Sequence, residues 1–429
     1  MIGVIADDVT GASDVAVAFR RGGLSAALYF GVPSPEAHVP SVDVIVIALT
    51  TRMASPTEAV SRSLLALDWL LAHGTSQTYF KYCSTFDSTA DGNIGPVLDA
   101  LRERLAVTTV VTTPSSPEHG RTQYLGHLFV GDQLLSDSPM RDHPVTPMRD
   151  SNLGRLLATQ STGTIGLIDA PAVWAGKAEV QRRIAEAEND HTATVFVDAT
   201  SHDDLRTIGG AVVDAVLLAG AAGLAEGFAE AVAKKKKRPA QPIGSVRLAS
   251  ARTAVIAGSC SKRTLEQIRY LTESGRAAYR IDVLAQPDPY LLAQEALEWY
   301  DALDSRLAPL FFSSLPAEQL RMVQETFGVA QSAAVVERAT ALIAIQLVER
   351  GVRRLICAGG ETSGAVLTAL RVEGGEVGDE AARGVPWIYS PTHGGVQLLL
   401  KSGNFGEPSL LADASATESS DQVPGCTDG

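Results

Sequence analysis

The chain has 429 residues, of which 45% are hydrophobic and 20% charged, and its formal net charge is -13. Single hydrophobic cores stop growing at roughly 250 to 300 residues, so this length predicts two domains. The composition is that of a folded globular protein rather than a disordered one. The negative charge disfavours nucleic acid as a partner.

The first residues and the cysteines bear on the compartment. Met1 is followed at once by a strand-like apolar segment, without a basic region and an apolar signal core, so we expect no secretion signal. The four cysteines lack the paired spacing of a zinc site, and free thiols suit a reducing, cytoplasmic location. The most apolar stretch, residues 215–225, contains two glycines and is too short to span a bilayer, so we expect no membrane partner.

Short apolar runs alternate with helical stretches in the first half of the chain. Such alternation predicts an α/β fold with a mainly parallel sheet flanked by helices. We predict strands at residues 3–6, 42–49, 78–84, 108–113, 195–198 and 212–218, and helices at residues 13–21, 59–72, 94–105 and 224–233.

A change of composition marks the end of the first domain. A basic run at 234–238 is followed by Pro239 and Pro242, which cannot join a central strand, so we predict an exposed linker rather than a nuclear localisation signal. Beyond it we predict strands at residues 253–257, 354–358 and 396–400, and helices at 265–273, at 333–350 and from about 365. The predicted order is a domain at 1–235, a linker at 236–247, a second domain at 248–412 and a disordered tail at 413–429.

Two adjacent aspartates follow the first predicted strand. In an open parallel sheet, ligands bind beyond the carboxyl ends of the strands, so polar residues directly after apolar runs are the first candidates. Asp7 and Asp8 hold this position, and Thr10 lies in the turn that leads from them into a helix. Because Ser13 or Asp14 could cap that helix alone, a ligand site is favoured over a mere turn and cap.

One basic residue follows the strand predicted at 42–49, and another lies within the strand predicted at 78–84. Arg52 stands just after the strand at 42–49, where a guanidinium suits bidentate capture of a carboxylate, with a surface salt bridge as the alternative. Lys81 lies within its strand, where a lone ammonium is hard to solvate, so a paired or ligand-binding role is favoured. Ser84 and Asp87 surround the end of the same strand.

Three further polar residues have structural roles as simple alternatives. Asn93 stands at the start of a predicted helix and could cap it. His119, which is followed closely by the candidate Arg121, and His143 have no partner at metal-ligand spacing. A structural role is therefore favoured for both histidines over a catalytic one.

Glycine-rich turns of the second half suit phosphate binding. Residues 258–261 and 359–363 each follow a predicted strand and precede a helix, where first-turn N–H groups and the helix dipole attract anions. A plain capped turn is the alternative for both, and neither matches the Walker or the GxGxxG pattern. Lys401 and Gly403 lie in a third polar turn, which could offset phosphate charge or be an ordinary hairpin.

These motifs, taken in order, resemble those of the four-carbon acid sugar kinase family. The resemblance covers the chain from Gly3 to about Gly406, and its specificity comes from the whole set rather than from any one segment. The matching segments are residues 5–12 (IADDVTGA), 81–96 (KYCSTFDSTADGNIGP), 143–148 (HPVTPM), 258–261 (GSCS), 359–363 (GGETS) and 401–406 (KSGNFG).

The resemblance implies a two-domain kinase. The first domain would bind a sugar acid and the second ATP, with the active site in the cleft between them and phosphate passing to the C4 hydroxyl. The motifs are closest to those of kinases that act on 3-oxo-tetronate. A kinase for D-threonate or D-erythronate, and a non-catalytic sensor of nucleotide and sugar acid, are the alternatives. Mg²⁺ is expected beside ATP because phosphoryl transfer depends on positioning and charge neutralisation, and a homo-oligomer is left open.

The resemblance also assigns roles to the candidate residues. Asp8 and Asp87 become candidates for the base that accepts the hydroxyl proton, a task worth about 10²- to 10⁴-fold in rate. Asp7 would contact the substrate or a metal ion. The remaining sugar-acid contacts implied are Thr10, Arg52, Lys81, Ser84 and Arg121, and the ATP contacts are Ser259, Ser261, Gly359, Gly360, Glu361, Thr362, Ser363, Lys401 and Gly403.

Overall fold

The computed structural model describes residues 1–237, 251–303 and 308–416, which form two compact units divided between Gly244 and Ser245. Of the predicted linker, only Lys236 and Lys237 belong to the described residues. The rest of the linker and the residues that follow it, as far as residue 250, lie outside them. In the predicted tail, residues 413–415 belong to a helix, while residues 417–429 lie outside the described part of the chain.

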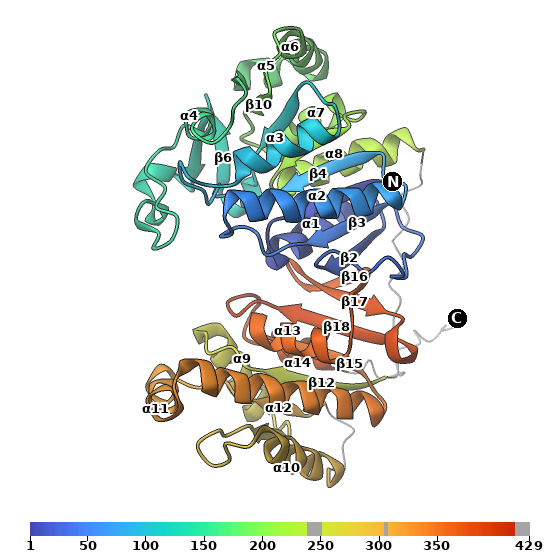
Figure 1. Cartoon of the computed structure of the whole chain (residues 1–429), viewed down its shortest axis with the longest axis vertical. Helices are drawn as coiled ribbons and strands as arrows, with labels where there is room; N and C mark the ends of the chain where they lie inside the picture. Colours follow the sequence, from blue (N-terminus) through green and yellow to red (C-terminus); the bar gives the residue numbers. More distant parts are fainter. Residues whose placement is uncertain (238–250, 304–307, 417–429) are drawn as a thin grey trace, which may run out of the picture. The chain divides into compact units, whose positions relative to one another are not determined.

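The first unit is built on a parallel sheet (Figure 1). Its strands are β1 (Ile2–Ala6), β2 (Ala26–Phe30), β3 (Val44–Ala48), β4 (Gln77–Lys81), β5 (Val110–Thr113), β9 (Ile165–Ile168), β10 (Thr194–Val197) and β11 (Leu217–Gly220). They lie in the order β2-β3-β1-β4-β11-β5-β10-β9, and each neighbouring pair is parallel. A small antiparallel sheet joins β6 (Arg121–Tyr124), β7 (His127–Val130) and β8 (Gln133–Leu134).

Helices cover both faces of the parallel sheet. They are α1 (Val9–Arg21), α2 (Pro56–Ala72), α3 (Ile94–Arg104), α4 (Leu153–Ala158), α5 (Ala170–Trp174), α6 (Lys177–Asn189), α7 (His202–Ala211) and α8 (Ala222–Lys235), with 3-10 turns η1 (Pro117–His119), η2 (Leu135–Asp137) and η3 (Pro139–Asp142). Successive strand residues face opposite sides. Tyr79 therefore meets Phe19 of α1, with ring centroids 5.9 Å apart, whereas Phe80 joins the core beneath α2 and α3.

The strand order brings the candidate residues of the first unit to one place. β1 has β3 on one side and β4 on the other, with Ala6 in register with Ala48 and with Lys81. The connections that leave β1 and β3 thus run to opposite sides of the sheet. Such a switch point in the strand order opens a crevice at the carboxyl ends of the strands. Asp7, which follows Ala6, enters this crevice beside Lys81.

The second unit has a mixed sheet. Its strands are β12 (Arg252–Ala257), β13 (Ala278–Arg280), β14 (Leu310–Phe312), β15 (Val352–Ala358), β16 (Gly374–Ala382), β17 (Val385–Ser390) and β18 (Val396–Lys401). β13-β14-β12-β15-β18 are parallel, and β17 and β16 continue the order antiparallel. The helices are α9 (Lys262–Glu273), α10 (Pro289–Asp301), α11 (Ala317–Phe327), α12 (Val329–Glu349), α13 (Gly360–Ala369) and α14 (Leu410–Ser415), with the 3-10 turn η4 (Thr392–Gly394).

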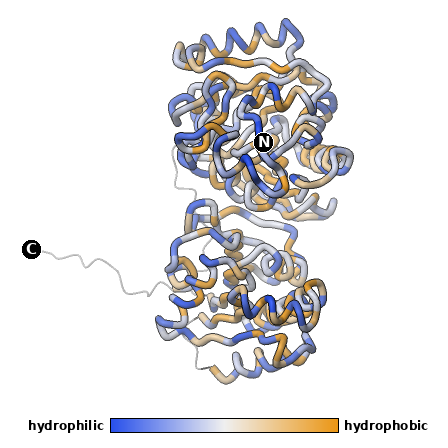
Figure 2. The backbone as a smooth tube through the Cα atoms, turned by 90° about the vertical axis from the view of Figure 1, so that its left-hand side faces the viewer, coloured by the Kyte–Doolittle hydropathy of each residue, from blue (hydrophilic) through white to orange (hydrophobic). Residues whose placement is uncertain are grey.

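The surface helices differ in how much of their length is buried. α6 is largely hydrophilic in Figure 2, where it lies at the upper end, and it buries only Val180. α12 is the one helix in the described ranges that is long and apolar enough to cross a membrane. Its buried hydrophobic residues, among them Ile343 and Leu347, begin at Ala339, and the helix packs among α10, α13 and β15.

The α/β class predicted from the sequence is confirmed. Several predicted elements have different bounds, and the largest shifts are at the start of β11 and of α13. The strand predicted at 212–218 is wrong in its first half, because α7 continues to Ala211 and Val212 closes it, so β11 begins only at Leu217. The helix predicted from about 365 begins at Gly360, because Gly359 takes the turn at φ 129°. A residue with a Cβ rarely adopts that conformation.

A buried carboxylate ties the small antiparallel sheet to the parallel one. Asp198 follows β10 and is 0% exposed. It accepts hydrogen bonds from Nε2 of Gln123 at 3.0 Å and from the backbone N–H groups of Leu125, Gly126 and Ala170 at 2.6, 2.9 and 3.1 Å. Most of these bonds are buried, so water cannot readily replace the carboxylate as the acceptor.

Replacing this carboxylate should therefore destabilise the first unit. Asp198→Ala is expected to lower the free energy of unfolding by at least about 3 kcal/mol, because several buried donors lose their acceptor together. Denaturant unfolding followed by circular dichroism measures the change. Asp190→Ala, at the exposed end of α6, is the control and should change stability by less than about 0.5 kcal/mol.

Candidate active site

Asp7 and Asp8 leave β1 side by side and share one arginine. Nε and Nη2 of Arg52 donate to the two oxygens of Asp7 at 2.8 and 2.9 Å, and Nη2 also donates to Oδ1 of Asp8 at 2.5 Å. Asp7 is buried, at 5% exposure. The guanidinium predicted to capture a substrate carboxylate is thus already paired with two carboxylates of the protein.

Asp8 has both roles that the sequence left open, because it is the helix cap and a member of the charged cluster. Its Oδ1 accepts the N–H of Gly11 at 2.9 Å and caps α1, which begins at Val9 rather than at the predicted Ser13. In the described part of the chain Oδ2 has no hydrogen-bond donor. Burial raises the pKa of Asp8, and the charge of Arg52 offsets this only in part.

Arg52 is held in its charged form despite its burial. Burial disfavours the guanidinium charge, but the hydrogen bonds and negative charge of Asp7 outweigh it and raise the pKa of Arg52 above its usual value. The turn that carries Arg52 is fixed by Asn93, whose Nδ2 donates to the carbonyls of Thr51 and Ala54 at 2.8 and 2.9 Å. Asn93 makes no side-chain cap bond to α3, so the capping alternative is wrong.

Lys81 ends β4 beneath the first turn of α1. It is 3% exposed, and its Nζ donates to the carbonyl of Tyr82 at 2.9 Å. Among the described residues no carboxylate lies within 4 Å of this ammonium. Gly11 makes room for it, because a Cβ built there would lie 2.7 Å from Nζ and 2.4 Å from Oδ1 of Asp8. The cluster therefore contains a buried cation with unused donors, close to the positive end of a helix.

Asp14 belongs to the same surroundings and was not predicted as a site residue. It lies three residues after Gly11, on the same face of α1. Burial raises the pKa of Asp14, and the charges of Lys81 and His119 offset this in part. Within the described ranges its carboxylate has no hydrogen-bond partner. Helical spacing from Gly11 could have identified Asp14, had the start of α1 been placed correctly.

Asp87 joins the charged cluster from the other side of Arg52. Its Oδ1 accepts the hydroxyl of Thr85 at 2.5 Å, and its Oδ2 lies 3.9 Å from Nη1 of Arg52. Thr10 and Ser84 are half-buried in the segments that follow β1 and β4. These segments therefore surround one charged group, which consists of Asp7, Asp8, Arg52, Lys81 and Asp87.

The hydrogen bonds of Arg121, His119 and His143 are made to residues close to them in the sequence. The guanidinium of Arg121 donates to the carbonyl of His119, and no contact joins it to the charged group within the described chain. Nδ1 of His119 lies 3.6 Å from Oε1 of Glu118. Nδ1 of His143 accepts the N–H of Thr146 at 3.1 Å, which is a local structural contact.

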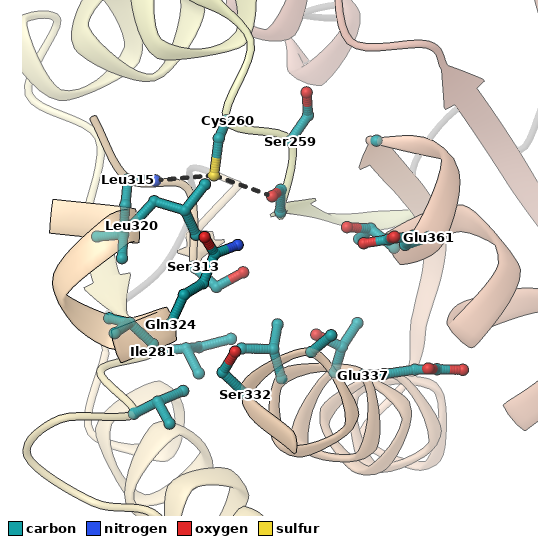
Figure 3. Close-up of a pocket in the computed structure, with 18 of the residues that line it drawn as sticks. Ser259, Cys260, Ile281, Ser313, Leu315, Leu320, Gln324, Ser332, Glu337 and Glu361 are labelled. Atoms are coloured by element: carbon teal, nitrogen blue, oxygen red, sulfur yellow. Dashed lines mark hydrogen bonds between the residues drawn. The ribbon is translucent and has the colours of Figure 1, made fainter. Parts of the chain in front are cut away.

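The predicted phosphate loops of the second unit line one cavity of about 570 Å³ (Figure 3). β12 and β15 are neighbours, so the turns that follow them lie together at this unit's own switch point. Of the predicted nucleotide contacts, Ser259, Gly359, Gly360, Glu361 and Thr362 line the cavity.

The third polar turn packs against the first. Oγ of Ser261 donates to the carbonyl of Gly403 at 2.6 Å, and a Cβ built on Gly403 would lie 2.6 Å from Oγ of Ser259. Nζ of Lys401 is buried beneath this turn and donates to the same carbonyl at 2.9 Å. Burial, together with the charge of Arg263, lowers the pKa of Lys401 to about 8.

Lys401 and Ser363 thus support the loops rather than line the cavity. The N–H of Ser363 donates to the carbonyl of Gly359 at 2.9 Å inside the first turn of α13. Over the described residues, no group of three or more His, Cys, Asp or Glu side chains is arranged to hold a metal ion by itself.

Two family models match the chain, one in each unit. A sugar-binding N-terminal domain matches residues 2–228, and a nucleotide-binding C-terminal domain matches residues 254–411. The chain is 42% identical over 417 residues to a 3-oxo-tetronate kinase of Pectobacterium atrosepticum, covering 96% of this chain and 98% of the relative. It is 40% identical to a 3-oxo-tetronate kinase of Haemophilus influenzae over 408 residues, covering 95% and 97%.

A solved structure agrees with these relatives. A Haemophilus influenzae protein superposes with a TM-score of 0.87 at 39% identity, and the match covers 96% of this chain and 98% of that one. The two family models and the kinase relatives together define the chain as a small-molecule kinase. The chain belongs to the four-carbon acid sugar kinase family, as its motifs predicted.

Proposed function

We propose that this enzyme transfers the γ-phosphate of ATP to the C4 hydroxyl of 3-oxo-tetronate. The observation that carries this proposal is the match, over 96% of the chain, to relatives named 3-oxo-tetronate kinase. The cytoplasm, where ATP is available, is the compartment we propose. D-Threonate and D-erythronate have the same carboxylate and terminal hydroxyl, so they remain the alternative substrates.

Lys81 binds the carboxylate of the acid in this proposal. Its ammonium is buried, has a single hydrogen bond and lies beside no protein carboxylate within 4 Å in the described residues. A charge in such surroundings is stabilised when an anion supplies the missing partner. Arg52 supports the site differently, by fixing the orientation of Asp7 and Asp8.

Asp8 is the base that we assign to the C4 hydroxyl. Asp7 uses both oxygens on Arg52, and Asp87 has one oxygen bonded to Thr85 and the other near Arg52. Asp8 keeps Oδ2 unbonded among the described residues, and its side chain is 26% exposed. Burial moves its pKa upward, in the direction that makes a carboxylate a better proton acceptor.

ATP binds with its phosphates at the glycine turns that line the cavity, where backbone N–H groups and the helix ends attract anions. The carboxylate of Glu361 lines the same cavity and is exposed. A carboxylate beside phosphates suits a hard divalent cation, so the residues fit Mg²⁺ with Glu361 as its protein ligand. Bound Mg²⁺ would neutralise phosphate charge during transfer.

A panel of four-carbon acids tests the function directly. Purified enzyme with ATP is given 3-oxo-tetronate, D-threonate, D-erythronate and L-threonate, and ³¹P NMR locates the phosphate on each product. We expect the highest kcat/KM with 3-oxo-tetronate and phosphate on C4. A preference for another acid would replace the substrate assignment, whereas ATP binding without turnover of any acid would favour the sensor. Light scattering on the same sample gives the oligomeric state.

A glycine of the second turn tests the nucleotide loops. Gly360→Val is expected to weaken ATP binding at least about 10-fold, because its side chain would fill space that the phosphates need. A Cβ at Gly360 meets no atom within 4 Å, so the fold should be kept. Gly364→Val, on the same helix and equally free of close neighbours, is the control. Calorimetry measures both, and unchanged affinity in Gly360→Val would remove this turn from the site.

A further inference from the structure

The cavity of the second unit has two chemically different ends. The glycine turns at Gly258 and at Gly359–Gly360 form one end. Away from them the walls are apolar, with contributions from Ile281 and Val323, which are both buried. Phosphates suit the first end, and a flat heteroaromatic base suits the second, because apolar walls shield its faces while a few polar groups can pair its edge.

Gln324 brings a carboxamide to the apolar end. Figure 3 shows it reaching from α11 into the cavity. Its side chain has no hydrogen-bond partner in the described part of the chain. Two other polar side chains that line the cavity are already engaged. Oγ of Ser332 donates to the carbonyl of Gly328 at 2.8 Å, and Arg280 pairs with Asp282 at 3.3 Å.

We propose that Gln324 reads the base of the nucleotide donor. A carboxamide carries a donor and an acceptor side by side, and the edge of adenine offers a ring nitrogen acceptor beside its amino donor. The two edges pair bidentately, with the amide NH₂ donating to the ring nitrogen and the amide oxygen accepting from the amino group. Glu337 also lines the cavity, but it is exposed and its carboxylate can only accept. The inference rests on the proposed placement of ATP in this cavity.

Changing the amide to a carboxylate tests this proposal. A carboxylate can only accept hydrogen bonds. It therefore cannot pair with the ring nitrogen acceptor of adenine, but it can pair with the two adjacent N–H donors of guanine. We compare kcat/KM for ATP with kcat/KM for GTP. Gln324→Glu is expected to change the ratio of these two values in favour of GTP by at least about 10-fold. The ratio removes any general repulsion of triphosphate by the added charge. Gln331→Glu adds the same charge at an exposed position of α12 that does not line the cavity, and it should leave the ratio unchanged.

A second variant separates the two proposals. Ala333 lines the cavity but is exposed, so Ala333→Phe should fold and should weaken ATP and GTP alike by at least about 10-fold. If Ala333→Phe weakens both nucleotides and Gln324→Glu leaves their ratio unchanged, Gln324 does not read the base. If Ala333→Phe leaves both affinities unchanged, the nucleotide lies elsewhere and both proposals fail. Gln324→Leu, which removes both polar groups, should lower ATP affinity and serves if the glutamate variant is unstable.

Discussion

Asp8→Asn is expected to lower the turnover number by at least about 100-fold, because an amide cannot accept the proton of the C4 hydroxyl. Asparagine is as good a helix cap as aspartate, so the bond from the N–H of Gly11 should be kept. ATP affinity, which depends on the second unit, should change little. Steady-state kinetics measure the turnover number, and calorimetry measures ATP binding by the same protein.

Comparison with a second aspartate makes the test of the base decisive. Asp87→Asn should lower turnover less than Asp8→Asn, because Asp87 is bonded by Thr85 and lies beside Arg52. The reverse order would move the base to Asp87. Near-normal turnover in both variants would show that neither is the base, and Asp14 would then be the next candidate. Asp132→Asn, in an exposed turn, controls for loss of one negative charge.

Lys81→Met is expected to have two opposite effects. The KM for the acid should rise by roughly 10- to 150-fold, because a hydrogen-bonded ion pair with the carboxylate is worth about 1.5 to 3 kcal/mol. The enzyme without ligand should melt at a higher temperature than the parent, because an ammonium with no carboxylate within 4 Å among the described residues is costly to bury and methionine is not. Kinetics and calorimetric melting, with and without the acid, measure the two effects.

Each effect has its own contradicting outcome. An unchanged KM would place the carboxylate at another cation, for which Arg121 is the remaining candidate of the first unit. A lower melting temperature without ligand would show that Lys81 stabilises the fold by itself. Lys177→Met, at the exposed start of α6, removes a charge from the surface and should change neither quantity.

The sequence predicted which residues meet but not how they pair. Parallel strands end at a common edge, which is why Asp8, Arg52, Lys81 and Asp87 could be grouped from the sequence alone. Arg52 and Asp7 are 45 residues apart in the sequence. The register of β1 with β3 brings them together in space. A pattern of apolar residues does not fix that register. Of the two roles predicted for Arg52, capture of a substrate carboxylate or a salt bridge, the structure shows pairing with Asp7 and Asp8.

Two of the strands missing from the prediction are too short to show a periodic signal. β13 and β14 have three residues each, too few to show the alternation of a strand. α11 buries only Val323, because its apolar side lines a cavity and not the core. Its place at this cavity therefore could not be predicted from the sequence. Gln324 was missed because α11 itself was not predicted, whereas Asp14 was missed on a helix that was predicted.

Gly11 has a consequence for recognising this site in other proteins. A side chain at this position would collide with the ammonium of Lys81 and with the capping carboxylate of Asp8. A sequence that carries alanine there, together with both charged residues, must arrange its helix or its lysine differently. The triplet of aspartate, glycine three positions later and lysine at the end of the strand beside them is therefore a geometric signature. It can be used to sort uncharacterised sequences and to choose which positions to leave unchanged in redesign.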